Sequence, residues 1–400
     1  MKKLLAILLA GVMTASLVAC GSAPVEESKA PETTQTESQT ETNTNTENTE
    51  AATGAALKVA IVSSPSGVDD GSFNQDNYNG VLAFIAENSA TTVTPVREET
   101  GDVAACNQLV ADIVADYDVI VCCGFQFAGI GDIAAENPDT KFVLIDAWPT
   151  VEGAELTADT ALSNVYAAYY AEQESGFLAG MAAALSTKSG KVAVVNGIAY
   201  PSNVNYQYGF ECGVKYVNET EGTAVEIVEL ASYAGTDVTG ANVGGNYVGS
   251  FADEAGGKVL GNALIAEGVD IMFVAAGGSG NGVITAAKEA EGVMIIGCDV
   301  DQYDDGANGD TNVILTSGLK VMHDTVYNVL NTVADGSFAG ACVTLMANTN
   351  STGYVNAEGR HQLTADAVAK IDAAFAKLQS GEIVPAANFN GITPETFEVK

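Results

Sequence analysis

The sequence predicts an α/β protein built from two doubly wound lobes with parallel sheets, and two observations carry this prediction. Short, continuously apolar segments rich in β-branched residues alternate with longer segments of helical spacing. A continuous apolar run is typical of a strand covered by helices on both faces of a parallel sheet. The same order of elements then occurs twice, which predicts two lobes of similar plan with right-handed β-α-β connections.

The two copies of this repeat can be followed strand by strand. Their first strands are predicted at 57–63 and 191–196, and helices are expected to begin near Asn77 and Tyr208. The later strands form matching pairs: 91–96 and 224–230, 117–124 and 269–277, and 141–147 and 293–300. Further helices are predicted at 102–117, with Asp102 as the N-cap, and at 253–267.

The remaining segments are expected to connect the lobes. The helix predicted at 172–186 leads from the first lobe to the second, and Gly176 and Gly180 would permit its close packing against another helix. Residues 311–320 and the helix after them lead back. The prediction is therefore one lobe of residues 57–170 plus about 321–400, which includes a tail strand near 343–346 and a helix at 365–379, and a second lobe of 171–320.

The N-terminal residues predict export. Lys2 and Lys3 precede an apolar run that is too short to span a bilayer comfortably, as in a signal peptide of residues 1–20. The run ends in Leu17-Val18-Ala19-Cys20, which resembles a bacterial lipobox and implies acylation of Cys20; the alternative is an ordinary secretory signal with an incidental cysteine. Residues 21–56 are rich in Thr, Glu and Ser, and this composition predicts a disordered tether.

Charge and composition narrow the ligand class. The net charge of −35 disfavours nucleic acid, because phosphate backbones bind basic surfaces. Arg97 and Arg360 are the two arginines of the chain, so a neutral, hydroxyl-rich ligand fits better than a carboxylate or phosphate. Six cysteines besides Cys20, mostly in apolar patterns, and two histidines favour buried thiols over a zinc site or a disulfide framework. We therefore predict neither a metal site nor a cofactor.

A glycine-rich stretch raises the possibility of an enzyme. Residues 277–282 follow a predicted strand and open a helix, and Asp299 follows at a spacing that invites a dinucleotide interpretation. The G-x-G-x-x-G fingerprint fails because Val283 stands at its third glycine. The chain also contains no H-E-x-x-H, G-x-S-x-G or Walker A sequence. Glycines that let backbone approach a ligand or the opposite lobe are the simpler explanation, so we expect a binding protein.

Ligands of doubly wound sheets bind outside the carboxyl ends of the strands, and this rule selects candidate residues. They are Ser63, Ser64, the loop through Phe73, 124–127 and Asp146 in the first lobe, and 196–206, 276–282 and 299–302 in the second. Aromatic rings there (Phe73, Tyr78, Phe125, Trp148, Tyr206) could stack on a ligand ring. The carboxylates of Asp146 and Asp299 could accept hydrogen bonds, although each could equally cap the segment that follows it.

Five sequence blocks in order resemble the basic membrane protein family of lipoproteins, the purine-nucleoside receptors of ABC uptake systems. The blocks are Val68–Gln75, Ala135–Phe142 with Ile145 and Asp146, Glu174–Gly180, Gly209–Asn218, and Ala275–Gly280 with Asp299, Asp301 and Gln302. The resemblance implies a type I periplasmic-binding fold. It also implies a nucleoside held between aromatic rings, with carboxylates and a lysine on the ribose.

Carried over by position, the resemblance implies a role for each site residue. Phe73 would stack on the base; Asn74 and Asp146 would bind its edge; Tyr206 or Phe251 would supply the opposite ring; and Gly277, Asp299 (or Asp301) and Lys320 would address the ribose. Relatives usually have an aspartate where this chain has Ser64, and tend to have Phe where it has Tyr206. A serine can still bind a ribose hydroxyl, without the strength of a carboxylate.

The leading prediction is thus a monomeric, lipid-anchored nucleoside receptor on the extracytoplasmic side of the cell membrane, delivering its ligand to an ABC permease. A receptor of the same fold for a sugar or a sugar-derived signal is the nearest alternative. An NAD-binding enzyme and an adhesin with a vestigial cleft are further alternatives.

Overall fold

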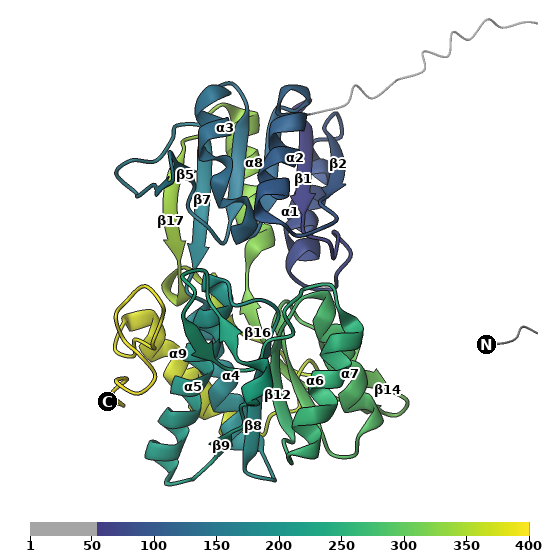
Figure 1. The fold of residues 1–400 in the computed structure, drawn as a ribbon, viewed down its shortest axis with the longest axis vertical. Helices are drawn as coiled ribbons and strands as arrows, with labels where there is room; N and C mark the ends of the chain where they lie inside the picture. The colour runs from purple at the N-terminus through teal and green to yellow at the C-terminus, as the bar shows by residue number, and fades with distance from the viewer. Residues whose placement is uncertain (1–53, 400) are drawn as a thin grey trace, which may run out of the picture. The chain divides into compact units, whose positions relative to one another are not determined.

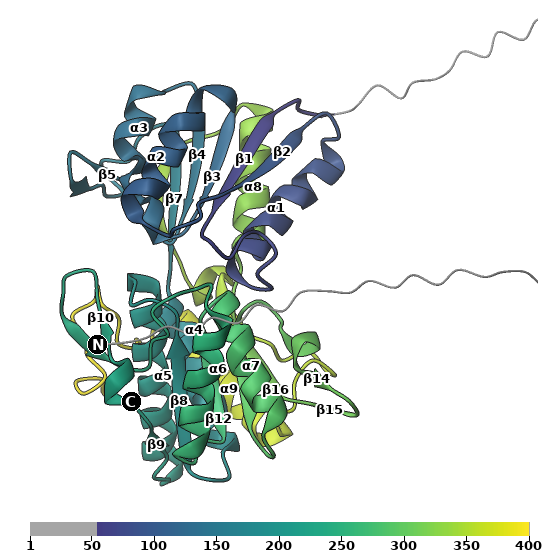
Figure 2. The same cartoon turned by 45° about the vertical axis from the view of Figure 1, so that its right-hand side comes forward.

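The computed structural model describes residues 54–399, which form two α/β lobes, each with a six-stranded sheet (Figures 1 and 2). The predicted signal peptide, Cys20 and nearly all of the predicted tether lie outside the described residues. No helix among residues 54–399 has the length and apolarity needed to cross a membrane.

Lobe 1 contains the sheet β17-β7-β4-β3-β1-β2, in which all neighbours are parallel. Its strands are β1 (Lys58–Ser63), β2 (Thr92–Arg97), β3 (Val119–Cys123), β4 (Lys141–Ile145), β7 (Val165–Tyr170) and β17 (Ala341–Leu345). Its helices are α1 (Phe73–Glu87), α2 (Val103–Ile113), α3 (Gly131–Glu136) and α8 (Met322–Asp335). The predicted N-cap of α2 is confirmed, because the Asp102 carboxylate accepts from the backbone N–H of Ala105.

Lobe 2 repeats this plan with the sheet β18-β16-β13-β12-β8-β9, where only β18 runs antiparallel. Its strands are β8 (Lys191–Asn196), β9 (Glu226–Ile227), β12 (Ile271–Ala275), β13 (Met294–Asp299), β16 (Ile314–Lys320) and β18 (Thr352–Tyr354). Its helices are α4 (Glu172–Ser186), α5 (Pro201–Glu221), α6 (Glu254–Ala266), α7 (Gly278–Glu289) and α9 (Ala365–Ser380). Small hairpins pair β5 (Thr150–Val151) with β6 (Ala154–Glu155), β10 (Gly235–Thr236) with β11 (Asn242–Gly244), and β14 (Ala307–Asn308) with β15 (Thr311–Asn312).

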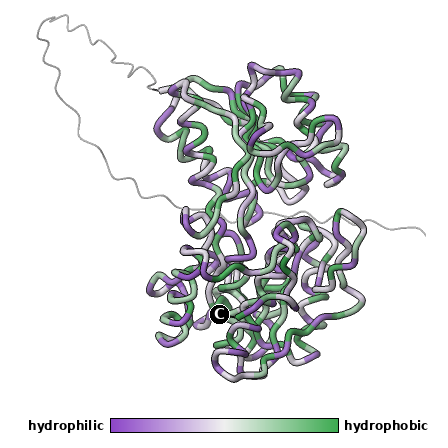
Figure 3. The backbone as a smooth tube through the Cα atoms, turned by 90° about the vertical axis from the view of Figure 1, so that its left-hand side faces the viewer, coloured by the Kyte–Doolittle hydropathy of each residue, from purple (hydrophilic) through white to green (hydrophobic). Residues whose placement is uncertain are grey.

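Both sheets are apolar through their interior, as the continuous strand patterns predict. Val59–Val62 of β1 and Val192–Val195 of β8 are fully buried, and Figure 3 shows the hydrophobic segments running through each lobe. Separate hydrophobic clusters lie on the two faces of each sheet. Helices therefore cover both faces, which confirms the predicted doubly wound α/β class.

The helix that follows each half of the repeat packs in the other lobe. The chain leaves β7 of lobe 1 and enters α4, which packs on α5 of lobe 2. It leaves β16 of lobe 2 and enters α8, which packs on α1 of lobe 1. Both crossings were expected from the sequence, and they place the carboxyl ends of the strands of both sheets at the junction of the lobes.

The tail differs from the expected arrangement. Strand β17 joins lobe 1 as predicted, but the chain then crosses a third time, at the turn 347–349, and its remaining elements lie in lobe 2 rather than lobe 1. The apolar face of α9, including Ile371 and Leu378, shares a core with Phe177 of α4, and β18 extends the second sheet. Burial of this face fixes the position of α9, and no local sequence pattern says against which lobe it packs.

Two helices begin earlier than predicted. Helix α1 starts at Phe73 rather than near Asn77, and α5 starts at Pro201 rather than near Tyr208. The first turns of both helices are mainly polar, so apolar spacing does not reveal them. The shift matters for function, because it places the first turn of each helix at the junction of the lobes.

The buried carboxyl of Glu211 in α5 is expected to make the stability of the protein depend on pH. Burial raises its pKa to about 8, a hydrogen bond from Gln207 lowers it, and Glu229 and Glu395 raise it further. A carboxyl whose folded-state pKa is raised contributes stability below its unfolded pKa and loses it as the pH rises through the folded value. We therefore expect Glu211→Gln to match the wild type at pH 5 and to exceed it by about 2 kcal/mol at pH 9, allowing for partial exposure.

Urea denaturation at pH 5, 7 and 9 measures this difference. Glu291→Gln, at an exposed position, is the matched control and should leave the pH slope unchanged. An equal slope in Glu211→Gln and the wild type would contradict the effect.

Candidate ligand-binding site

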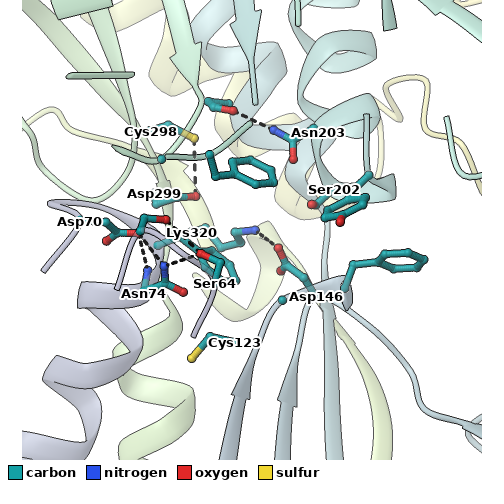
Figure 4. Close-up of a pocket in the computed structure, with 18 of the residues that line it drawn as sticks. Ser64, Asp70, Asn74, Cys123, Asp146, Ser202, Asn203, Cys298, Asp299 and Lys320 are labelled. Carbon is teal, nitrogen blue, oxygen red and sulfur yellow. Dashed lines mark hydrogen bonds and ion pairs between the residues drawn. The ribbon is translucent and has the colours of Figure 1, made fainter. Parts of the chain in front are cut away.

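A pocket lies at the carboxyl ends of the strands and is lined by both lobes (Figure 4). The structure brings nine of the ten predicted site residues together in its wall: Ser64, Phe73, Asn74, Asp146, Tyr206, Phe251, Gly277, Asp299 and Lys320. Their roles toward a ligand stay predictions.

Asp301, the predicted alternative to Asp299, is not part of the wall. It lies two residues beyond the end of β13, where its carboxylate accepts from the Arg360 guanidinium at 2.6 Å. Arg360 also binds Asp304, so this group is a surface ion-pair cluster. The structure therefore selects Asp299 as the cleft carboxylate.

Lys320, the last residue of β16, is buried between two carboxylates. Its ammonium Nζ lies 2.6 Å from Asp146 Oδ2 and 3.4 Å from Glu172 Oε1, and the exposed fraction of Lys320 is 2%. The same ammonium lies 4.9 Å from the ring centre of Phe73 and 5.4 Å from that of Tyr206. A buried charge needs such partners, and this lysine joins the end of β4, the start of α4 and the predicted stacking ring.

The electrostatics of this cluster follow from its burial. Burial raises the pKa of Asp146 and of Glu172, and the attraction of Lys320 opposes both shifts. Burial alone would lower the pKa of Lys320, but its two carboxylate partners outweigh burial and raise it. Lys320 is therefore a permanent cation in the wall of the pocket.

Asp146 and Asp299 occupy equivalent places in the two halves of the repeat. Asp146 follows β4 and Asp299 ends β13, and both adopt the left-handed backbone conformation, with φ of 64° and 70°. Such a conformation is uncommon for a residue with a side chain and clusters at functional sites. Neither carboxylate accepts a backbone N–H, so the capping interpretation of these aspartates does not hold.

Asp299 of lobe 2 accepts a hydrogen bond from lobe 1. Its Oδ2 accepts from the hydroxyl of Ser72 in lobe 1 at 2.8 Å, and its Oδ1 accepts from the Tyr206 hydroxyl at 2.9 Å. Burial and the negative charge of Asp299 hold the pKa of Tyr206 well above its usual value, so this hydroxyl keeps its proton and donates. The Tyr206 hydroxyl, which the Phe of relatives would lack, is thus directed at Asp299.

Asp70 organises the loop before α1. Its two oxygens accept from the backbone N–H groups of Ser72, Asn74 and Gln75, and Oδ2 also accepts from the Asn74 side chain. Asp70 thereby satisfies the first turn of α1, a task that usually falls to the residue before the helix. The hydroxyl of Ser72 is consequently free to reach Asp299.

Aromatic rings line the pocket from both lobes. Phe73 and Phe125 come from lobe 1, and Tyr206 and Phe251 from lobe 2. Tyr200 lies between Phe125 and Phe251, with ring centres 5.2 and 6.0 Å away. Tyr78 and Trp148, which the sequence also suggested, do not line the pocket, and the Trp148 indole donates to the carbonyl of Val343 instead.

The glycine-rich stretch forms the entrance to α7 and approaches the opposite lobe. Gly277 lines the pocket with φ of 52°. A Cβ on Gly278 would lie 3.1 Å from the Phe251 carbonyl and 3.5 Å from Cβ of Ser66 in lobe 1. The tight contacts of these glycines are with neighbouring segments of lobe 2, and the contact with Ser66 is at ordinary van der Waals distance, so packing within lobe 2 rather than approach of the opposite lobe accounts for them.

Sequence reasoning missed Glu172, which lies directly behind the pocket on Lys320. Ser66, Asp70, Tyr200 and Ser202 line the pocket and belong to loops that the sequence selected, but no role for any of them followed from the sequence. Asp70 could have been assigned one, as the acidic residue ahead of an early start of α1. Glu172 could have been found as an acidic residue at a crossing between the lobes, where a buried charge is available to pair.

Two doubly wound lobes with a pocket at their junction, lined by both, define a receptor of the type I periplasmic-binding class. An ABC transporter solute-binding protein from Aeropyrum pernix has this fold, with a TM-score of 0.68 and 23% identity over 84% of this chain and 94% of its own. The family model described as ABC transporter substrate-binding protein PnrA-like (Bmp) matches residues 57–370, and the chain belongs to this family. It is a family of substrate-binding proteins, not of enzymes.

Individual relatives agree with this assignment. The chain is 28% identical to the ABC transporter nucleoside-binding protein BmpA of Lactococcus lactis, over 78% of this chain and 85% of the relative. It is 27% identical to a CD4+ T-cell-stimulating antigen of Listeria monocytogenes, over 81% and 87%. Basic membrane protein A of Borreliella burgdorferi is 31% identical over 58% of this chain and 61% of the relative. The resemblance read from the five sequence blocks is thereby confirmed.

Proposed function

We propose that this protein is an extracytoplasmic, lipid-anchored receptor that binds a purine nucleoside in the cleft and delivers it to an ABC permease. The observation that carries the proposal is one buried pocket that combines aromatic rings from both lobes with carboxylates at equivalent strand ends. A flat heterocycle can stack on the rings, and the carboxylates accept from its N–H groups and from hydroxyls. A relative named as nucleoside-binding supports the same ligand class.

The charge of the pocket favours an uncharged ligand. Asp70, Asp146 and Asp299 line it, Glu172 lies behind it, and Lys320 is its single cation. A nucleotide phosphate would meet carboxylates with no arginine to bind it, because Arg97 and Arg360 lie outside the wall. The free nucleoside therefore fits better than its phosphate ester.

The anchor and the partner belong to the same proposal. Lipid on Cys20 and a tether over residues 21–56 would hold the folded body near the membrane while it captures ligand. A monomer suits delivery to a permease. Opening would occur about the three crossings, with Ser72 and Asp299 separating as the lobes part.

Replacing Phe73 tests the site. We expect Phe73→Ala to weaken purine-nucleoside binding about 10- to 100-fold, because stacking on one aromatic ring is worth about 1–3 kcal/mol. Isothermal titration of the full chain in detergent with guanosine, inosine, adenosine, cytidine, uridine, ribose and NAD gives the affinities. Phe389→Ala removes an exposed ring of lobe 2 and is the matched control.

Ligand that co-purifies with the protein separates the alternatives, since purines absorb ultraviolet light and sugars do not. A wild-type protein that binds ribose and no nucleoside would establish the sugar receptor. Equal affinities in Phe73→Ala and Phe389→Ala would remove Phe73 from the site.

A further inference from the structure

The C-terminal strap, which we define as residues 383–399, lies along α5 in lobe 2 (Figure 1). It follows α9 and lies beyond residue 370, where the match to the family model ends. Ile383, Ala386 and Phe397 of the strap are at most 5% exposed and belong to the hydrophobic core around α4 and α5. The strap is therefore a packed part of lobe 2, although the family match does not cover it.

Polar contacts with α5 hold the strap along its length. The ammonium of Lys215 donates to three carbonyl oxygens of the strap, those of Pro394, Glu395 and Phe397, at 3.2, 3.1 and 2.7 Å. Nearer the start of the strap, the backbone N–H of Ala386 donates to Cys212 Sγ at 3.4 Å. The side chain of Asn388 donates to the carbonyl of Pro201 at 3.2 Å. Asn388 is thereby placed beside the first turn of α5.

A backbone N–H of the strap sets the direction of the Asn205 side chain. The N–H of Asn388 donates to Asn205 Oδ1 at 2.9 Å, and Asn205 Nδ2 donates to Glu172 Oε2 at 3.2 Å. A backbone N–H donates and a carboxylate accepts, so turning the amide over would lose both bonds and set like groups against each other. Asn205 is 3% exposed, and a buried amide without partners is destabilising.

Glu172 joins Asn205 to the wall of the pocket. Its Oε1 lies 3.4 Å from Lys320 Nζ, and Lys320 also donates to Asp146 Oδ2 at 2.6 Å. Asn205, Glu172 and Lys320 are each at most 3% exposed. A continuous series of hydrogen bonds and ion pairs thus runs from the exposed Asn388 to the ligand pocket.

We propose that the strap supports the ligand site, and that Asn205 is a positioning residue that the strap orients and that holds Glu172 against Lys320. This inference rests on the proposed function. With the Asn205 donor in place, Glu172 keeps its charge and Lys320 is shared between two carboxylates. Without this donor, Glu172 takes up a proton more readily. Lys320 is then drawn to Asp146 alone, which makes that carboxylate a weaker acceptor for a ligand.

Opposing groups decide the charge of Glu172. Burial raises its pKa to about 7, Lys320 lowers it, Asp146 raises it, and the hydrogen bond from Asn205 lowers it. The other titratable groups near Glu172 are two hydroxyls whose own pKa values are raised, those of Tyr169 in β7 and Tyr206 in α5. Loss of the Asn205 donor should raise the pKa of Glu172 to about 8, because a hydrogen bond to a charged group changes the protonation equilibrium about 10-fold.

Asn388→Pro removes the N–H that orients Asn205. The N–H of Asn390 donates to the carbonyl of Ala387 at 3.3 Å, so Asn388 is the second residue of a turn, a position that proline favours. Asn388→Ala keeps the N–H, loses the side-chain bond to Pro201 and is the matched control. Asn205→Ala removes the donor to Glu172 directly and serves if Asn388→Pro does not fold.

Urea denaturation of the ligand-free full chain between pH 5 and pH 9 tests the link to Glu172. A carboxyl whose folded-state pKa is raised contributes stability below its unfolded pKa and loses it as the pH rises through the folded value. Asn388→Pro should therefore show a deficit against Asn388→Ala that grows from pH 5 to pH 9. Adding Glu172→Gln to both variants should remove this growth. A deficit that is constant with pH overturns the inference.

Isothermal titration with guanosine, inosine and adenosine over the same pH range tests the link to the site. In the wild type and Asn388→Ala, affinity should fall as the pH falls through about 7. In Asn388→Pro and Asn205→Ala, this fall should be centred near pH 8. A common midpoint in Asn388→Pro and Asn388→Ala overturns the inference, as does a wild-type affinity that is independent of pH. Absence of nucleoside binding by the wild type would overturn the proposed function, and the urea experiment would still decide whether the strap acts on Glu172.

Discussion

Lys320→Met is expected to destabilise the protein by about 3–5 kcal/mol at neutral pH. The substitution keeps an unbranched side chain that is shorter by one atom, but it leaves Asp146 and Glu172 buried without their cation. Removing one partner of a buried ion pair costs more than the pair contributes, because the remaining charge is neither solvated nor compensated. Urea denaturation of the variant and the wild type measures the difference, and Lys188→Met, at an exposed position, is the control.

The loss should depend on pH in a defined direction. Burial already raises the pKa of both carboxyls in the wild type, and removal of Lys320 raises each further. Protonation in the folded state relieves the unpaired charge, so the loss should be smaller at pH 5 than at pH 8. The double variant Lys320→Met/Asp146→Asn should recover much of the stability at pH 8. A loss that is independent of pH and not recovered would show that packing, rather than charge, is responsible.

Lys320 also illustrates what the sequence could and could not predict. The strand before it and its place at the end of that strand follow from the apolar pattern, and its role in a site followed from the family resemblance alone. Its burial did not follow, since a lone lysine is more often on the surface. The lysine is buried because Asp146 and Glu172, more than 140 positions earlier in the chain, converge on it.

Some parts of the fold were likewise predictable from the sequence and others were not. The two lobes, their strands and the first two crossings were predictable, because a parallel strand covered on both faces needs a continuous apolar run. The position of α9 was not, since an amphipathic face indicates burial without naming the partner. The starts of α1 and α5 were missed for a related reason: their polar first turns line the cleft, where function rather than burial sets the residues.

The sequence did not decide which of two nearby aspartates after a strand lies in the site. Asp299 and Asp301 were both candidates, and only the structure shows that the first lies in the cleft while the second binds Arg360. Asp70 has no apolar pattern to mark it. Its importance comes from four hydrogen bonds that exist only once α1 begins at Phe73.

The packing of α4 on α5 supports the lobe 2 side of the cleft and depends on glycine. A Cβ on Gly176 would meet the carbonyl oxygen of Tyr206, and a Cβ on Gly180 would meet that of Phe210. The contact is reciprocal, since Gly209 and Gly213 of α5 face backbone carbonyls of α4 in the same way. Helices at this distance cannot accept a methyl group without separating, because the opposing atoms are backbone and cannot rotate away.

Gly180→Ala is therefore expected to cost about 3 kcal/mol of stability. Overpacking against rigid backbone outweighs the gain of about 1 kcal/mol that alanine brings to a helix interior. Gly261→Ala in α6 is the matched control, because its new methyl would lie 3.1 Å from Cβ of Ala286 and 3.3 Å from Cγ1 of Val283, with no backbone carbonyl among these contacts, so the helix gain offsets most of the strain. Urea denaturation of both variants decides the point. Equal, small losses would mean that α4 and α5 can separate freely, and close glycine packing would then no longer explain how α5 holds Tyr206 against Asp299.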